Sequence, residues 1–497
     1  MCYMNWAEKA QEITWRIKPF INGSYRDSIS SKSFDNVDPA TGKVLCQVAE
    51  GGEKDIEQAV KVAHQCFNEG CWSGLAPDAR KAILKNFADL IDKDKNYLAL
   101  LDTLEMGKPI TAALADVDTA IRIMRQTAEL VDKVLGDAAS IIGANLSVNI
   151  YEPRGVVGAI APWNFPVVNA VTKIAPSLAA GNTLVLKPSE LTSGSALKLA
   201  ELAIEAGVPA GVFNVVPGLG RTVGAALASH HDVDLLTFTG STQTGRLLMA
   251  LSGQSNAKPL LLECGGKSPH VVFDDVDNLD FIAEAAVQKM FWNQGQVCSA
   301  LTRLIIHEKI KQPLLDRIVS LAQKIQPADP LDKATTFGAL ASVQQRDRVK
   351  AYIELGITEG AVPLLGGVDA LHKGTGCFVA PTIFDNVTTT MRIAQEEIFG
   401  PVLCVQGFND ESEALAIANG TCYGLSATVW TRDLGRGKRM AQSLRAGGIS
   451  VRSSGKESSV LPFMDFEPQK ASGFGGEFGL HGLQSYSQLK AINFIGG

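Results

Sequence analysis

The chain has 497 residues, a formal net charge of −6 and a pI near 5.8. This length exceeds that of one ordinary hydrophobic core, so we expect two or three domains. Hydrophobic residues make up 46% and charged residues 20% of the chain, which excludes wholesale disorder, and the acidic balance argues against a nucleic-acid-binding protein.

The first residues, Met1 to Lys9, lack the basic and apolar regions of a signal peptide, and no apolar run is long enough to span a bilayer. The nine cysteines are scattered, and the sequence has no Cys-x-x-Cys and no His-x-x-x-His. These patterns predict reduced thiols, a cytoplasmic protein without membrane contact, and no bound metal.

The N-terminal third combines short strands with helices. Residues 18–50 are typical of strands joined by turns at Asn22-Gly23 and at Asp38 to Gly42. Residues 53–135 show the three-four apolar spacing of helices. From residue 155 the pattern changes to short apolar runs separated by helical stretches, as expected of buried parallel strands; the runs are 155–160, 182–186, 211–216 and 234–238.

A second alternating series follows Glu263, with strands expected near residues 270, 303, 403, 428 and 449. We therefore predict an α/β protein with two domains and a site in the cleft between them, where strand ends and domain junctions form ligand pockets. Residues 143–153 and 484–494 also alternate like strands but belong to neither series.

Two residues of this second half suggest covalent chemistry. Cys298 follows a polar turn that contains Gly295, and Glu263 lies 35 positions earlier (298 − 263 = 35), beside two glycines. A thiol nucleophile and a separate carboxylate base are what a two-stage reaction at a carbonyl requires. Either motif alone is more often a buried cysteine or a simple turn.

Two strand ends in the first series suggest a dinucleotide. The strand at 182–186 leads to Lys187 and Glu190, which can bind ribose hydroxyls, and a carboxylate there repels a 2′-phosphate. The strand at 234–238 leads to Gly240 and Ser241, whose turn opens a helix and exposes backbone amides to a pyrophosphate.

Six separated motifs together identify a family. With these motifs in this order, the chain resembles the NAD(P)-dependent aldehyde dehydrogenase superfamily from about residue 18 to the C-terminus, and it looks closest to bacterial aminoaldehyde and γ-glutamylaminobutyraldehyde dehydrogenases. The motifs are Pro162-Trp163-Asn164-Phe165-Pro166, Lys187-Pro188-Ser189-Glu190, Phe238-Thr239-Gly240-Ser241-Thr242, Leu262-Glu263-Cys264-Gly265-Gly266-Lys267, Gln294-Gly295-Gln296-Val297-Cys298 and Gln395-Glu396-Glu397-Ile398-Phe399-Gly400-Pro401.

The resemblance implies a role for each matching residue. Cys298 would be the nucleophile, Asn164 the oxyanion donor together with the Cys298 backbone amide, and Glu263 the base that activates water. NAD would be the cofactor, with NADP possible. The implied cofactor residues are Lys187 and Glu190 at the adenosine ribose, Gly240 and Ser241 at the pyrophosphate, Glu397 at the nicotinamide ribose, and Phe399 and Trp163 near the nicotinamide.

The resemblance also implies an architecture and an assembly. Residues 1–131 and 154–264 would form a Rossmann-like NAD-binding domain, and residues 265–470 the α/β catalytic domain. Residues 132–153 and 471–497 would form a small β oligomerisation arm that extends a neighbour's sheet, which predicts a homodimer or homotetramer.

The substrate pocket departs from the family. Thr172 stands where close relatives carry tryptophan, and in residues 453–459, which should border the aldehyde entrance, Ser, Lys and Glu replace an aromatic wall; Arg452 precedes this segment and Lys456 lies in it. Either cation would favour aldehydes with a distal carboxylate if it faces the tunnel, but each is equally well explained as a solvated charge. The expected apolar walls are Trp163, Phe165, Trp292 and Phe463.

Three functions remain open at this point. The presence of Glu263 favours hydrolytic, NAD-dependent oxidation of a small aldehyde. In a CoA-acylating relative, CoA would take the acyl group instead of water. A structural or binding protein on a catalytically retired fold would have no reason to keep Cys298, Asn164 and Glu397 together.

Overall fold

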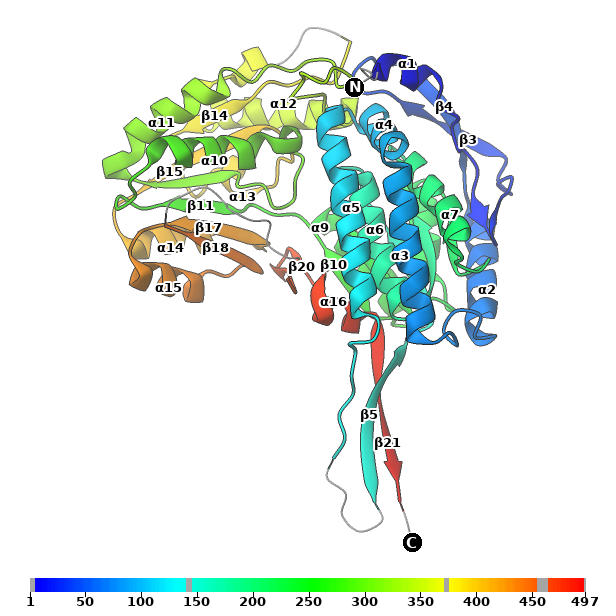
Figure 1. Ribbon diagram of the computed structural model, residues 1–497. Helices are drawn as coiled ribbons and strands as arrows, with labels where there is room; N and C mark the ends of the chain where they lie inside the picture. The colour runs from blue at the N-terminus through cyan, green and yellow to red at the C-terminus, as the bar shows by residue number, and fades with distance from the viewer. Residues whose placement is uncertain (1–4, 140–144, 371–374, 454–463, 496–497) are drawn as a thin grey trace.

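The computed structural model describes residues 5–139, 145–370, 375–453 and 464–495. Two large, mostly parallel sheets lie beside each other, each covered by helices, and a two-stranded ribbon projects from the body (Figure 1). This arrangement confirms the predicted α/β class.

The first sheet has eight strands, and its five central strands are parallel. Its centre is apolar on both faces because helices cover both, which explains the uninterrupted apolar runs in the sequence. Its order is β2 (Ser24–Tyr25), β1 (Phe20–Ile21), β8 (Phe213–Val215), β7 (Thr183–Lys187), β6 (Val156–Ile160), β9 (Leu235–Thr239), β10 (Leu260–Glu263) and β20 (Gly473–Phe474).

The second sheet has seven strands, of which only β13 pairs antiparallel. In the described part of the chain, β13 and β18 are its two edges. The order is β13 (Val362–Leu365), β14 (Thr382–Asp385), β15 (Val402–Phe408), β12 (Arg303–His307), β11 (Pro269–Val272), β17 (Ser426–Trp430) and β18 (Gly448–Arg452).

Three two-stranded sheets complete the strands. The projecting arm is the longest of them, and its antiparallel register runs from Ser487 opposite Pro153 to Phe494 opposite Leu146 (Figure 1). The three pairs are β3 (Lys32–Val37) with β4 (Val44–Glu50), β16 (Tyr423–Gly424) with β19 (Gln469–Lys470), and β5 (Leu146–Pro153) with β21 (Ser487–Phe494).

Helices cover both sheets, and the longest of the described helices, α5, belongs to the first half. Around the first sheet lie α1 (Trp6–Gln11), α2 (Glu53–Asn68), α3 (Pro77–Lys93), α4 (Lys95–Met106), α5 (Ile110–Leu130), α6 (Pro166–Ala179), α7 (Gly194–Ala206), η1 (Gly220–Gly224), α8 (Ala225–Ser229), α9 (Thr242–Gln254) and α16 (Gly479–Ser485). The second half contains α10 (Leu279–Phe291), η2 (Trp292–Gly295), α11 (Glu308–Ala322), α12 (Val343–Thr358), η3 (Gly367–Ala370), α13 (Arg392–Gln395), α14 (Glu411–Asn419) and α15 (Leu434–Ser443). None of the described helices is long and apolar enough to cross a membrane.

The strands expected in both series are present, as are the two arm strands. The sequence did not predict β10, β13, β14, β16, β19 and β20, which are short. β20 returns from the C-terminal segment to pair with β10 in the first sheet, so residues 473–474 complete the sheet formed by the first half of the chain. The domain boundaries drawn from the sequence remain predictions.

One expectation about the cysteines is wrong. Cys66 and Cys71 form a disulfide, with their Cα atoms 5.6 Å apart. Helix α2 ends at Asn68, and the chain turns back at once, which brings the two residues within disulfide range. The other six cysteines in the described part are free.

Candidate active site

A cavity of about 220 Å³ lies where the two large sheets meet. Residues from the first sheet reach it from the carboxyl ends of β6 and β9, and residues from the second half reach it from the loops that precede β12 and β15. Eight of the residues singled out in the sequence line this central cavity: Trp163, Asn164, Phe165, Gly240, Ser241, Cys298, Glu397 and Phe399.

Cys298 follows a tight turn after α10. Asn293 and Gln294 adopt positive φ angles of 50° and 57°, and Gly295 continues in the same left-handed region. Such consecutive left-handed residues are strained and persist only when their surroundings hold them. Burial, together with the carboxylates of Glu263 and Glu397, raises the pKa of Cys298 to about 12. The free protein therefore holds a protonated thiol at neutral pH.

Asn164 is tied to the loop that carries Cys298. Its side-chain amide donates to the Gln296 carbonyl at 3.0 Å, and its own carbonyl accepts from the Asn293 side chain at 3.0 Å. Asn169, one turn into α6, donates to the Asn164 side-chain oxygen at 3.2 Å. These bonds fix a side-chain N–H donor beside the thiol, as an oxyanion site requires.

Glu263 ends β10 and lies against a separate, buried group of charges. Burial and the nearby Glu477 carboxylate raise the pKa of Glu263 well above its ordinary value. Its Oε1 has no hydrogen-bond partner among the described residues. A carboxyl group with a raised pKa and a spare acceptor oxygen binds a proton more readily than an exposed one, as a general base must.

The sequence reading did not find the charges behind Glu263. Lys173 on α6 forms a buried ion pair with Glu477, with Nζ and Oε1 2.6 Å apart. The Glu477 carboxylate raises the pKa of Lys173 even though burial opposes it. The two residues are 304 positions apart, and neither belongs to a local motif, so the sequence carried no signal for the pair.

The two residues expected at an adenosine ribose lie together at the carboxyl end of β7. Lys187 is buried, and its Nζ lies 3.1 Å from Glu190 Oε2. Burial opposes the shift, but the Lys187 ammonium lowers the pKa of Glu190 below its ordinary value. The Glu190 carboxylate is therefore ionised at neutral pH, and it would repel a negative charge bound beside it.

The glycines of the predicted pyrophosphate and ribose sites are required by close contacts. A Cβ at Gly240 would lie 2.5 Å from the Phe238 ring, and a Cβ at Gly265 would lie 2.3 Å from Glu397 Oε2. Ser241 caps α9 by accepting from Thr244 N, and Glu397 Oε1 accepts from Gly266 N at 2.9 Å. Both glycines are thus needed for packing within the protein, and the Glu397 carboxylate lies over the Gly265-Gly266 backbone.

The residues expected at the substrate are only partly brought together. Phe165 lines the central cavity and packs on Trp292, with ring centroids 5.0 Å apart. Thr172 lies one turn beyond Asn169 and lines a small neighbouring cavity with Thr127 and Glu477. Lys456 and Phe463 lie outside the described residues.

Arg452 lies away from Cys298. The hydroxyl of Ser426, the first residue of β17, donates to the Ser299 carbonyl, so the nucleophile lies at the amino end of that strand. Arg452 ends the adjacent strand β18 opposite Trp430, and its guanidinium lies over the Trp430 ring at 5.5 Å. Four residue steps along a strand separate the two ends by roughly 13 Å.

Comparison with known proteins identifies the family. The model of the Aldehyde dehydrogenase family matches residues 25–492. The chain belongs to the aldehyde dehydrogenase family. It is 43% identical to the NADP/NAD-dependent aldehyde dehydrogenase PuuC of Escherichia coli over 98% of this chain and 97% of that protein. It is 42% identical to the aminoacetaldehyde dehydrogenase of Pseudomonas aeruginosa over 96% of this chain and 95% of that protein.

The solved structures agree with this assignment. An indole-3-acetaldehyde dehydrogenase in complex with NAD+ matches with a TM-score of 0.95 and 43% identity, over 98% of both chains. These similarities bear out the resemblance to bacterial aminoaldehyde dehydrogenases. The protein is therefore an aldehyde dehydrogenase, with the aldehyde dehydrogenase fold.

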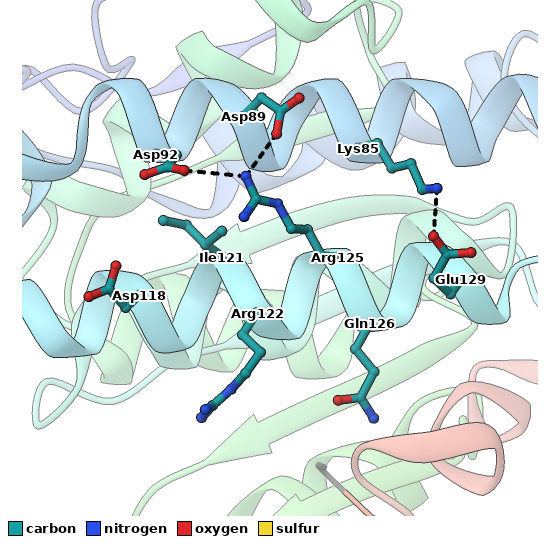
Figure 2. Close-up of a pocket in the computed structure, with 9 residues that line it drawn as sticks. All are labelled: Lys85, Asp89, Asp92, Asp118, Ile121, Arg122, Arg125, Gln126 and Glu129. Atoms are coloured by element: carbon teal, nitrogen blue, oxygen red, sulfur yellow. Dashed lines mark hydrogen bonds and ion pairs between the residues drawn. The ribbon is translucent and has the colours of Figure 1, made fainter. Parts of the chain in front are cut away.

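A larger cleft lies between α3 and α5, away from the central cavity. Figure 2 shows Arg125 reaching from α5 to Asp89 and Asp92 on α3, with Lys85 paired to Glu129 beside it. These ion pairs connect the two helices to each other. We therefore place the chemistry in the central cavity and not in this cleft.

Proposed function

We propose that this aldehyde dehydrogenase oxidises an aldehyde to the carboxylic acid with NAD, through a thioester on Cys298. The observation that supports this most is the convergence of Cys298, Asn164 and Glu397 on one cavity, with Glu263 at the adjoining strand end. Each of these residues ends, follows or precedes a different strand. A catalytically retired protein would not need to keep all four at one site.

Cys298 and Asn164 carry the first half of the reaction. The Cys298 thiol gives its proton to water, the thiolate attacks the aldehyde carbon, and the carbonyl oxygen gains the negative charge. The Asn164 side-chain amide and the Cys298 backbone amide donate hydrogen bonds to that oxygen. The result is a thiohemiacetal, which becomes a thioester on the Cys298 sulfur when it is oxidised.

Glu263 carries the second half. Its carboxylate accepts a proton from a water molecule, and the hydroxide attacks the thioester carbon. The carbon–sulfur bond breaks, and the acid and the free Cys298 are released. The buried Lys173–Glu477 pair holds a balanced charge behind Glu263.

The residues at the strand ends fit NAD. Gly240 and Ser241 line the central cavity at the N-terminus of α9, where backbone amides can meet a pyrophosphate, and Lys187 and Glu190 can bind the hydroxyls of the adenosine ribose. When bound, NAD supplies the hydride acceptor for the thiohemiacetal. The ionised Glu190 carboxylate disfavours the 2′-phosphate, so NADP is a poorer cofactor.

The substrate is an aldehyde whose distal end is neutral or carries an amine. The described residues that line the cavity beside Thr172 include no cation; Glu477, the one charged residue among them, is paired with Lys173, and Arg452 lies at the far end of β18. Relatives that act on aminoacetaldehyde and on γ-glutamyl-γ-aminobutyraldehyde agree with this chemistry. In the CoA-acylating alternative, CoA replaces water, so no base is needed to activate water. Glu263 Oε1, which has no hydrogen-bond partner among the described residues, can accept a proton from water and so favours hydrolysis.

The test is NADH formation with a panel of aliphatic, aromatic, acidic and amino aldehydes, with and without CoA. We expect turnover without CoA, no stimulation by CoA, and a higher kcat/KM for 4-aminobutyraldehyde than for succinic semialdehyde. A requirement for CoA would assign the acylating reaction instead. The absence of NADH formation with every aldehyde would favour a catalytically retired protein.

The protein is a cytoplasmic homodimer or homotetramer in which the arm of one subunit extends the second sheet of another. The free edge of β18 carries an apolar side chain, Val451, that is 44% exposed. Val451→Lys places a charge on this edge and should reduce the mass measured by light scattering at micromolar concentration. Val362→Lys is the matched control, because Val362 is also 44% exposed and lies on the opposite edge strand, β13. Equal masses for both variants and the parent would contradict this assembly.

A further inference from the structure

A buried ion pair lies behind the wall of the central cavity. Lys108 lies between Gly107, which ends α4, and Pro109, which precedes α5, and its side chain is only 1% exposed. Its ammonium forms a hydrogen-bonded ion pair with Asp116 on α5, whose side chain is 6% exposed. Neither residue lines the central cavity.

The ammonium of Lys108 also meets an aromatic ring. It lies 4.2 Å from the centroid of the Phe165 ring. A cation is attracted to the negative face of such a ring, and the attraction is strongest when the ammonium is removed from water. Phe165 in turn packs on Trp292, so its ring is held between Lys108 and the start of the turn that leads to Cys298.

The chain around Phe165 is fixed at a second point. Asp102, at the centre of α4, accepts a hydrogen bond from Val167 N at 3.1 Å, in the first turn of α6. Asn164 immediately precedes Phe165, so this segment is anchored by Asp102 through its backbone and by Lys108 through the aromatic ring. Asp102 and Lys108 thus each contact the segment that follows Asn164, and Asp116 holds Lys108.

Stability alone does not explain such a pair. Removing two charges from water is costly, and replacing a buried pair with well-packed apolar residues is often neutral or even stabilising. The charged pair contributes something that an apolar pair would not, namely a cation fixed on the face of one particular ring.

We infer that Lys108, held by Asp116, is a positioning residue that orients the Phe165 ring and, through it, the Asn164 amide. This inference rests on the proposed role of Asn164 as oxyanion donor. Lys108 does not touch substrate or cofactor. Its effect is to hold the donor in place for the charge that develops on the substrate oxygen, which requires a geometry accurate to a fraction of an ångström.

The first test removes both charges together, so that neither is left buried and alone. In the variant Lys108→Met with Asp116→Leu we expect kcat for aldehyde oxidation to fall about tenfold, because the donor is no longer held in register. The affinity for NAD, measured by binding in the absence of aldehyde, should not change. A wild-type kcat in a folded variant would overturn the inference.

A matched control removes a similar pair elsewhere. Lys311 and Asp385 form an ion pair with a separation of 2.8 Å, and their side chains are 16% and 17% exposed. They lie on α11 and β14, far along the chain from Phe165. Lys311→Met with Asp385→Leu should leave kcat at the wild-type value. An equal fall in both double variants would show a general loss of rigidity and would overturn the inference.

A double-mutant cycle tests whether Lys108 acts through the ring. In a Phe165→Leu background, Lys108→Met with Asp116→Leu should cause no further fall in kcat. A further tenfold fall would show that Lys108 acts by another route. Asn164→Ala distinguishes failure of the proposed function: if that variant retains wild-type kcat, the oxyanion role is wrong, whatever the Lys108 variants show.

A second measurement keeps the proposal testable if the double variant does not fold. Progressive fluorination of the Phe165 ring weakens its attraction for a cation while nearly preserving its size. We expect log kcat to fall with each added fluorine when Lys108 is present. No trend across the series would overturn the inference.

Discussion

The two large sheets contribute to the same cavity from opposite ends of their strands. In the first sheet, the site residues follow their strands: Asn164 comes after β6, Gly240 after β9, and Glu263 ends β10. In the second sheet, they precede their strands: Cys298 comes before β12 and Glu397 before β15. The cavity lies where the carboxyl ends of one sheet meet the amino ends of the other.

This difference shows that the end of a strand is not a sufficient guide to a site. In open parallel sheets, ligands bind beyond the carboxyl ends of the strands, and the first sheet follows that rule. The second sheet reverses it, and Arg452, at the carboxyl end of β18, lies over Trp430 instead of near Cys298. The first sheet therefore brings Asn164, Gly240 and Glu263 to the site, and the second brings Cys298 and Glu397.

Removing the nucleophile gives the largest expected effect, because Cys298 is the reactive group that the second sheet brings to the cavity. In Cys298→Ala we expect aldehyde oxidation to fall by at least about a thousandfold, since no covalent intermediate forms. NAD binding, measured by fluorescence titration, should persist, because it depends mainly on the first sheet. Substantial residual turnover would show that another group attacks the aldehyde.

Glu263→Gln tests the contribution of the first sheet separately, because Glu263 lies at the carboxyl end of its strand β10. We expect steady-state turnover to fall about a hundredfold while a rapid first burst of NADH persists, because the thioester forms and is then hydrolysed slowly. Stopped-flow absorbance separates the two phases. If the burst disappears as well, Glu263 acts already in the first half of the reaction and the division of labour between the sheets is wrong.

The raised pKa of Cys298 predicts how the free enzyme reacts with iodoacetamide. Since this pKa is about 12, only the small thiolate fraction reacts, and that fraction grows about tenfold for each pH unit below the pKa. The rate of inactivation should rise about a hundredfold between pH 7 and pH 9. A rate that levels off below pH 9 would place the thiol pKa much lower.

Glu190→Gln gives the smallest effect and leaves the chemistry of both sheets intact. The ratio of kcat/KM for NADP to kcat/KM for NAD should rise about tenfold, because one negative charge no longer opposes the 2′-phosphate. The rate with saturating NAD should change little. An unchanged ratio would show that the carboxylate does not face the ribose.

The sequence predicted the parts of the fold and site that are encoded locally. Buried parallel strands produce apolar runs, and the motif residues flank those strands, so Asn164, Gly240, Cys298 and Glu397 were found in the sequence and the structure brings them to one cavity. The alternating arm strands were predicted for the same reason, and their pairing is confirmed.

The remainder depends on contacts between distant segments. Lys173 and Glu477 meet only because the chain returns after β18 to the first sheet, which no local pattern reveals. The possible place of Arg452 near the substrate could not be checked in the sequence. The chain departs from the family pattern in that segment, so the sequence does not show at which end of β18 the residue lies. The Cys66–Cys71 disulfide depends on how sharply the chain turns after α2.

The root of the arm reaches back to the catalytic carboxylate. Tyr486 immediately precedes β21, and its hydroxyl lies 3.2 Å from Thr237 Oγ1 in the first sheet, while Glu477 in the same C-terminal segment holds Lys173 beside Glu263. The C-terminal segment that forms the second strand of the arm thus also supplies the carboxylate that pairs with Lys173 beside Glu263, so a change at the root of the arm also changes the charges around Glu263.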